Sequence, residues 1–110
     1  MEHLLHLQSE PFRKIASGEK TVELRLFDEK RQKIAVGDTI RFLSPEGESL
    51  CAAVTELVTA PDFAALFEKL PPERCGFAPG EIPVPDCMDA YYSPVEQEKW
   101  GALGILLKLL

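Results

Sequence analysis

The sequence lacks long apolar runs, and cysteine is scarce. No stretch of 18 apolar residues occurs among its 110 residues, and the N-terminus has neither the basic start nor the long apolar centre of a signal peptide. We therefore expect a soluble, cytoplasmic protein.

The only cysteines are Cys51, Cys75 and Cys87, an odd number without Cys-x-x-Cys spacing. This pattern supports neither a disulfide framework nor a zinc site, so we expect reduced thiols, no metal and no cofactor.

Positive charge is also in short supply. Twelve Lys and Arg residues stand against eighteen Asp and Glu, for a formal net charge of −6. Affinity for long nucleic acid duplexes depends on cations that neutralise phosphates, so we expect no long duplex DNA and no membrane as partner. Residues 13–41 differ, with eight basic and five acidic residues. This local surplus suits a short single strand or a small anionic ligand, although Lys30, Arg31 and Lys33 can equally form a solvated loop face.

Repeats and low-complexity segments are absent, and length and apolar content (45%) suit one domain spanning residues 1–110. Alternating apolar residues predict strands over 3–8, 20–27, 39–44, 50–59 and 102–109. Helical spacing predicts helices over 9–18, 62–70 and 93–100. The proline-rich residues 71–87 are expected to lack regular structure and to form a loop that roofs a cleft or merely connects. The predicted fold is mixed α/β (α+β), a small β-barrel of about five to six strands with two to three short helices.

The segment Gly18-Glu19-Lys20-Thr21-Val22-Glu23-Leu24-Arg25 concentrates charged side chains where a helix passes into a strand. Strand alternation places the apolar and the polar side chains on opposite faces. The apolar set is Val22, Leu24 and Leu26, and the other set is Thr21, Glu23, Arg25 and Phe27. One face of this strand is therefore a candidate binding surface.

Two interpretations are open for each charged residue of this strand. Lys20 is either a surface lysine near a helix C-terminus or a partly desolvated lysine that can act as a base. Glu23 and Arg25 form either a simple salt bridge or a recognition device. In the second case Arg25 faces a phosphate or a base edge, and a free Glu23 oxygen accepts from an exocyclic amine.

The segment before the last predicted strand, Tyr91-Tyr92-Ser93-Pro94-Val95-Glu96-Gln97-Glu98-Lys99-Trp100-Gly101, contains a capping box. Ser93 is the expected N-cap and Glu96 its partner three residues later. Capping does not explain Glu98 or the two tyrosines, and Tyr92 can stack on a base beside a cleft. We expect Trp100 in the core.

Both segments resemble the ASCH domain family, whose hallmark is Gly-x-Lys-Thr-x-Glu-x-Arg after a helix, followed by a Gly-Asp turn. Here Gly18, Lys20, Thr21, Glu23 and Arg25 match it, with the turn at Gly37-Asp38. The resemblance implies a PUA-like β-barrel. It also implies a module for short single-stranded RNA or a nucleoside-like small molecule. The predicted ligand-binding residues are Lys20, Thr21, Glu23, Arg25, Tyr92, Ser93 and Glu98.

The resemblance also allows an enzyme, because one bacterial subgroup hydrolyses N(4)-acetylcytidine. In those relatives the shared lysine lies near a threonine and a glutamate, and Glu23 stands where they have the threonine. Lys20 and Glu23 would be the catalytic residues of a metal-independent amidohydrolase here, with Glu23 activating a water molecule. The counterpart of the relatives' glutamate, for which Glu81 is a candidate, cannot be assigned.

Overall fold

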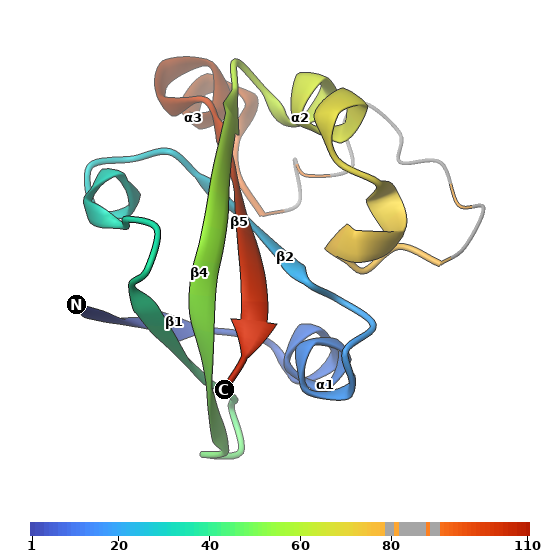
Figure 1. Ribbon diagram of the computed structural model, residues 1–110. Helices are drawn as coiled ribbons and strands as arrows, with labels where there is room; N and C mark the ends of the chain where they lie inside the picture. Colours follow the sequence, from blue (N-terminus) through green and yellow to red (C-terminus); the bar gives the residue numbers. More distant parts are fainter. Residues whose placement is uncertain (79–80, 82–87, 89–90) are drawn as a thin grey trace.

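The computed structural model describes residues 1–78, 81, 88 and 91–110, which form one curled sheet covered by helices (Figure 1). The elements in chain order are β1 (Glu2–His6), α1 (Ser9–Ser17), β2 (Val22–Leu26), the 3-10 helix η1 (Arg31–Lys33), β3 (Thr39–Leu43), β4 (Ser49–Ala60), α2 (Phe63–Lys69), the 3-10 helix η2 (Pro72–Cys75), α3 (Pro94–Trp100) and β5 (Ala102–Leu109). The predicted mixed α/β fold is confirmed, with the sheet curled into a half-barrel. No helix in the described ranges is long and apolar enough to cross a membrane.

One sequence prediction about regular structure is wrong. Residues 71–87 were expected to contain none, yet Pro72–Cys75 forms η2. Proline is compatible with the first turn of a helix, where its missing N–H has no intrahelical partner to lose. Gly76 then ends η2 with φ +101°, a left-handed conformation that favours glycine. Cys87 lies outside the described residues.

The sheet order is β1-β3-β4-β5-β2, so β1 and β2, which follow each other in sequence, lie at opposite edges. β1 pairs with β3 in parallel, and the other neighbours are antiparallel. The curl brings the two edges near each other at one end. There the Arg25 Nη2 of β2 donates to the His6 carbonyl at the end of β1, at 2.8 Å. A side chain therefore joins the two edge strands.

The long strand β4 connects both halves of the sheet. It pairs with β3 through its first residues and with β5 along most of its length, with a register shift between Val54 and Glu56. Thr55 is the extra residue at this register shift, and its hydroxyl donates to the Leu106 carbonyl at 3.2 Å. Such bulges bend a strand and increase its twist, which accounts for the curl of this sheet.

The core has two clusters, and β5 contributes to both. Leu103 and Ile105 pack with Phe42 and with Ile15 of α1 in the first cluster. Leu106 belongs to the second cluster, in which β2 packs under α2 and η2. The predicted apolar face of the second strand lies in that cluster as Val22, Leu24 and Leu26. Trp100, expected in the core, is only partly buried and packs at the edge of the second cluster.

Asp38 fastens the start of β1 to the turn before β3. Its carboxylate accepts from His3 Nε2 at 2.8 Å, from the Ala35 N–H at 3.0 Å and from the N-terminal amine at 3.3 Å. The His3 hydrogen bond and then the Ala35 N–H lower the pKa of Asp38 from 3.8 to about 2. The ionised carboxylate of Asp38 thus joins the start of β1 to the turn before β3.

We predict that Asp38→Asn destabilises the protein at pH 7 and that this difference from the native protein disappears in acid. A carboxyl whose pKa is lower in the folded than in the unfolded state stabilises the fold above the unfolded value. That contribution is lost as the pH falls from about 4 toward 2. Urea unfolding at pH 7, 4 and 2.5 measures it. Glu68→Gln, at an exposed position of α2, is the control; equal destabilisation by Asp38→Asn at all three pH values would contradict the assignment.

Candidate functional site

A cavity of about 600 Å³ lies where β1, α1, β2 and η2 meet the segment before α3. Lys20, Glu23, Arg25 and Tyr92, four of the residues predicted from the sequence, are in its lining. The three charged residues of the Gly-x-Lys-Thr-x-Glu-x-Arg motif, Lys20, Glu23 and Arg25, therefore line the same cavity. Gly76 and Phe77 contribute from the other side, so the segment after η2 forms part of the wall.

Lys20 is placed in the cavity by the end of α1. The helix ends at Gly18, whose φ of +86° turns the chain out of the helix, and the Lys20 N–H then donates to the Lys14 carbonyl at 3.0 Å. The Lys20 side chain is 10% exposed. Of the two sequence interpretations, the surface lysine is therefore wrong. The side chain is desolvated, as the other interpretation requires, and its role as a base stays a prediction.

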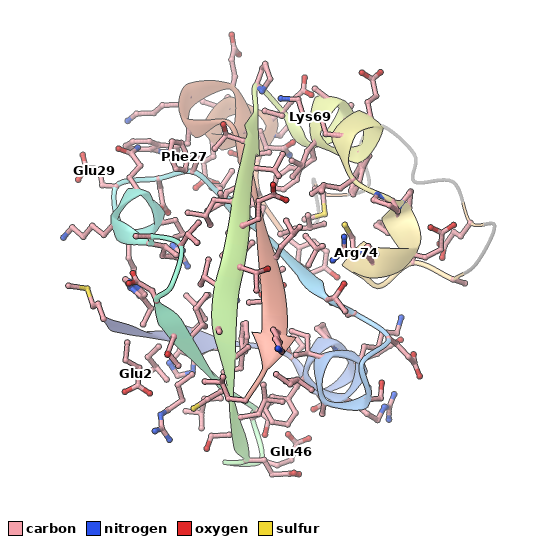
Figure 2. All side chains as sticks on the ribbon, in the orientation of Figure 1. Glu2, Phe27, Glu29, Glu46, Lys69 and Arg74 are labelled. Carbon is pink, nitrogen blue, oxygen red and sulfur yellow. The ribbon has the colours of Figure 1, made fainter. Side chains whose placement is uncertain are left out.

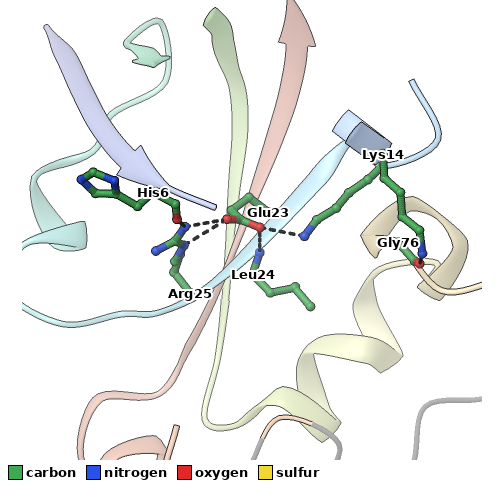
Figure 3. A network of polar contacts seen from close by, with 7 residues as sticks. His6, Lys14, Glu23, Leu24, Arg25 and Gly76 are labelled. Carbon is green, nitrogen blue, oxygen red and sulfur yellow. Dashed lines mark hydrogen bonds and ion pairs between the residues drawn. The ribbon is translucent and has the colours of Figure 1, made fainter. Parts of the chain in front are cut away.

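Glu23 is the centre of a buried ionic network (Figure 3). Its Oε1 accepts from Lys20 Nζ at 2.8 Å and from the Leu24 N–H at 3.2 Å. Its Oε2 accepts from Arg25 Nε at 3.0 Å and from Arg25 Nη2 at 2.8 Å. Burial alone would raise the pKa of Glu23, but the charges and hydrogen bonds of Lys20 and Arg25 outweigh it and hold this pKa below its usual range.

The network leaves the Glu23 carboxylate without spare acceptor capacity. A carboxylate has about four lone-pair sites, and four N–H donors already occupy them. The expected free oxygen that accepts from an exocyclic amine is therefore not present. The predicted salt bridge between Glu23 and Arg25 is present, and because Nε and Nη2 both donate to Oε2, it fixes the guanidinium.

Tyr92 forms an aromatic wall of the cavity. Its ring stacks on Phe63 of α2, with centroids 5.8 Å apart and planes 9° apart. Burial raises the pKa of the Tyr92 hydroxyl, so this group is a neutral donor. It has no hydrogen-bond partner within the described part of the chain. Tyr91 lies beside it at the rim, 67% exposed.

Three predicted ligand-binding residues, Thr21, Ser93 and Glu98, do not line this cavity. The Thr21 hydroxyl accepts from Arg74 Nε of η2 at 3.0 Å, on the part of the surface where Figure 2 labels Arg74. Ser93 is occupied by the capping box with Glu96, as its alternative explanation proposed. Glu98 is exposed and borders a separate shallow depression.

Glu81, the uncertain counterpart of a catalytic glutamate, is exposed, and its carboxylate accepts from the Ala78 N–H at 2.9 Å. It does not line the cavity. The structure thus brings no second carboxylate to Lys20 from this position. No group of three or more His, Cys, Asp or Glu side chains that could hold a metal ion occurs among the described residues.

η2 contributes to the site, and no motif in the sequence pointed to this contribution. Lys14 Nζ donates to the Gly76 carbonyl at 2.7 Å (Figure 3), and the Thr21 N–H donates to the Arg74 carbonyl at 2.8 Å. These bonds hold η2 against α1 and the start of β2. Cys75 lines the cavity, and burial raises the pKa of its thiol to about 11, so it is neutral. The only available sequence signal was the proline-rich segment itself.

Comparisons with known proteins agree with this architecture. A family model for the ASCH domain matches residues 5–108. The chain superimposes on hypothetical protein PH0355 with a TM-score of 0.85 and 27% identity, covering all of both chains. Protein PF0455 from Pyrococcus furiosus gives a TM-score of 0.75 and 29% identity, over 100% of this chain and 98% of that one.

A mutant of ZmASCH from Zymomonas mobilis gives a TM-score of 0.70 at 20% identity, over 97% of this chain and 67% of that chain. At this identity the likeness concerns the fold alone. No curated protein matches the chain.

Proposed function

The chain belongs to the ASCH domain family, and we propose that its cavity binds a short single-stranded RNA segment or a nucleotide-like small molecule. The observation that carries this proposal is the convergence of Lys20, Arg25 and Tyr92 on one hollow of about 600 Å³. That volume lies within the range of ligand sites in proteins. Two fixed cations beside an aromatic ring match the phosphates and bases of a nucleic acid.

The charge distribution limits the size of this ligand. The net charge of −6 opposes a long polyanion, whereas the buried network in the cavity combines two cations, Lys20 and Arg25, with the single carboxylate of Glu23. Outside the cavity, two basic residues of the 13–41 region are already paired: Arg31 with Asp28 and Arg41 with Glu2. These two pairs reduce the local surplus of positive charge that could follow a phosphate backbone. The ligand is short, and its bases supply most of the specificity.

The binding module is preferred to the amidohydrolase because of the state of Glu23. A general base needs a lone pair aimed at a water molecule, and the four contacts of the Glu23 carboxylate leave none. Lys20 donates to the same carboxylate. Lys20 and Glu23, the two residues that the amidohydrolase hypothesis requires, are thus hydrogen-bonded to each other. No further observation on the described residues favours catalysis.

We predict that a labelled short RNA binds with a shallow salt dependence. One to three neutralised phosphates give a slope of log affinity against log salt of about −0.7 per phosphate. Arg25→Ala is expected to weaken binding by about 1–3 kcal/mol, through loss of the charged hydrogen bond that Arg25 donates to the ligand. Lys33→Ala, at an exposed position of η1, should change little. Fluorescence anisotropy at several salt concentrations, with size-exclusion chromatography to check both variants, provides the measurement.

Two results would contradict the proposal. A slope matching six or more phosphates, or equal losses from Arg25→Ala and Lys33→Ala, would mean that a diffuse basic surface binds the RNA. Release of cytidine from N(4)-acetylcytidine without added metal, abolished by Lys20→Ala, would make the amidohydrolase the primary function.

A further inference from the structure

Three side chains of the cavity wall keep hydrogen-bond donors uncommitted: Lys20, Arg25 and Tyr92. Lys20 Nζ has three protons and gives one to Glu23. Arg25 uses Nε and Nη2 for Glu23 and His6, so its Nη1 has no partner within the described residues. The Tyr92 hydroxyl is likewise uncommitted there. The Glu23 carboxylate is fully occupied by its own donors.

The uncommitted donors lie at two ends of the Glu23 carboxylate. Lys20 contacts Oε1, whereas Arg25 contacts Oε2 and is seen on the His6 side of Glu23 in Figure 3. A ligand that satisfies both ends needs acceptor atoms at two separate places. A phosphate at one end and a carbonyl of a base at the other provide such a pair, whereas a single small ion does not.

The electrostatics of the cavity favour an anion at this place. Lys20 and Arg25 together with Glu23 leave one net positive charge at a site where their side chains are between 3% and 13% exposed. The other acid and base of the lining that pair, Glu10 and Lys14, neutralise each other. Tyr92 and Cys75 are neutral and do not offset the charge. A buried surplus of positive charge is stabilised by an oxyanion and opposes an amine.

The rest of the wall is suited to a ring. Tyr92 is held flat by its stack on Phe63, and Phe77 is held by an edge-to-face contact with Phe67 at 5.4 Å. Met88 and Pro11 add apolar surface beside them. Aromatic rings fixed by such contacts provide a stacking surface without a large entropic cost.

We propose, on the basis of the function proposed above, that the ligand class of this cavity is a nucleoside carrying a phosphate monoester, whose oxyanion is bound by Lys20. The same chemistry occurs in a free nucleoside monophosphate and in the phosphorylated end of a short RNA. Arg25 Nη1 and the Tyr92 hydroxyl then donate to a carbonyl of the base. Glu23 is a positioning residue: it holds both cations in place and does not itself contact the ligand.

Isothermal titration at low salt tests this with CMP, cytidine, inorganic phosphate and the dinucleotide CpC with or without a terminal phosphate. CMP is expected to bind at least about tenfold more tightly than cytidine, one tenfold step being about 1.4 kcal/mol. Lys20→Gln should reduce the ratio of the CMP to the cytidine affinity to about one, and Lys20→Arg should restore part of it. Lys33→Gln, outside the cavity, should leave the ratio unchanged. A purely structural loss in Lys20→Gln would weaken both ligands equally.

The outcomes separate this inference from the proposed function. Equal binding of CMP and cytidine would overturn the phosphate assignment and leave a nucleoside-binding cavity. Inorganic phosphate binding as tightly as CMP would also overturn it, since the nucleoside would then contribute nothing. Absence of binding by every nucleoside, nucleotide and dinucleotide would overturn both. If the phosphorylated dinucleotide binds more tightly than CMP, the source of the phosphate is an RNA end; if CMP does, it is a free nucleotide.

Discussion

Replacing Glu23 by alanine is expected to lower the free energy of unfolding by about 3–5 kcal/mol, the range for removing one partner of a buried ion pair. The Glu23 side chain is 3% exposed and holds Lys20, whose side chain is 10% exposed. Without the carboxylate, the Lys20 ammonium loses its buried counter-ion, and Nε and Nη2 of Arg25 lose the oxygen to which both donate. Urea denaturation followed by circular dichroism measures the change.

A double variant distinguishes the cost of an unpaired charge from the cost of lost packing. In Lys20→Met/Glu23→Leu, apolar side chains of similar size replace both ions, and such replacements are often neutral or stabilising. This variant should recover part of the stability that Glu23→Ala loses, because only Arg25 is left without its carboxylate, and it should bind CMP no more tightly than cytidine. A loss of less than about 1 kcal/mol in Glu23→Ala would show that Lys20 reaches water when its partner is absent.

Phe63→Ala should cost about 3–5 kcal/mol of folding stability, as is usual for a buried aromatic side chain. Phe63 is 1% exposed in the second core cluster, and its ring also supports Tyr92. Nucleotide binding should therefore weaken in the fraction that remains folded. Thermal unfolding gives the stability, and titration with CMP below the unfolding transition gives the affinity.

Phe42→Ala is the matched control for this prediction. Phe42 is fully buried in the first cluster and does not line the cavity. It should lose a similar amount of stability without a change in affinity. Equal affinities in the two variants would mean that Tyr92 holds its place without Phe63, and the stacked pair would then have no part in the site.

Local chemistry made much of this fold predictable. The five predicted strands and three predicted helices are all present. Gly18 ends its helix in the left-handed conformation, and Ser93 with Glu96 forms the capping box. Each of these features depends on residues within a few positions of one another. The alternation along β2 likewise separates Val22, Leu24 and Leu26 from Glu23 and Arg25.

The parts that could not be predicted depend on contacts between distant residues. Alternation suggested that one face of β2 is charged, but not that Glu23 is buried and saturated, because that depends on how the sheet curls. The attachment of η2 rests on a bond between Lys14 and Gly76, 62 positions apart. Glu98 looked unexplained only because a local pattern cannot tell which side of a short helix faces the cavity.

The bond from Arg25 to the His6 carbonyl has a consequence for self-association. β1 is an edge strand, and an unpaired edge invites pairing with a strand from another molecule. At His6 the acceptor that such a strand would use is already occupied by a guanidinium, which also brings positive charge to that edge. Arg25 thus hinders the addition of a strand from another molecule. Its removal is expected to leave the His6 carbonyl at the edge of β1 free to accept a hydrogen bond from such a strand. Loss of RNA binding in Arg25→Ala then has two physical sources, a missing contact and competition from another copy of the chain.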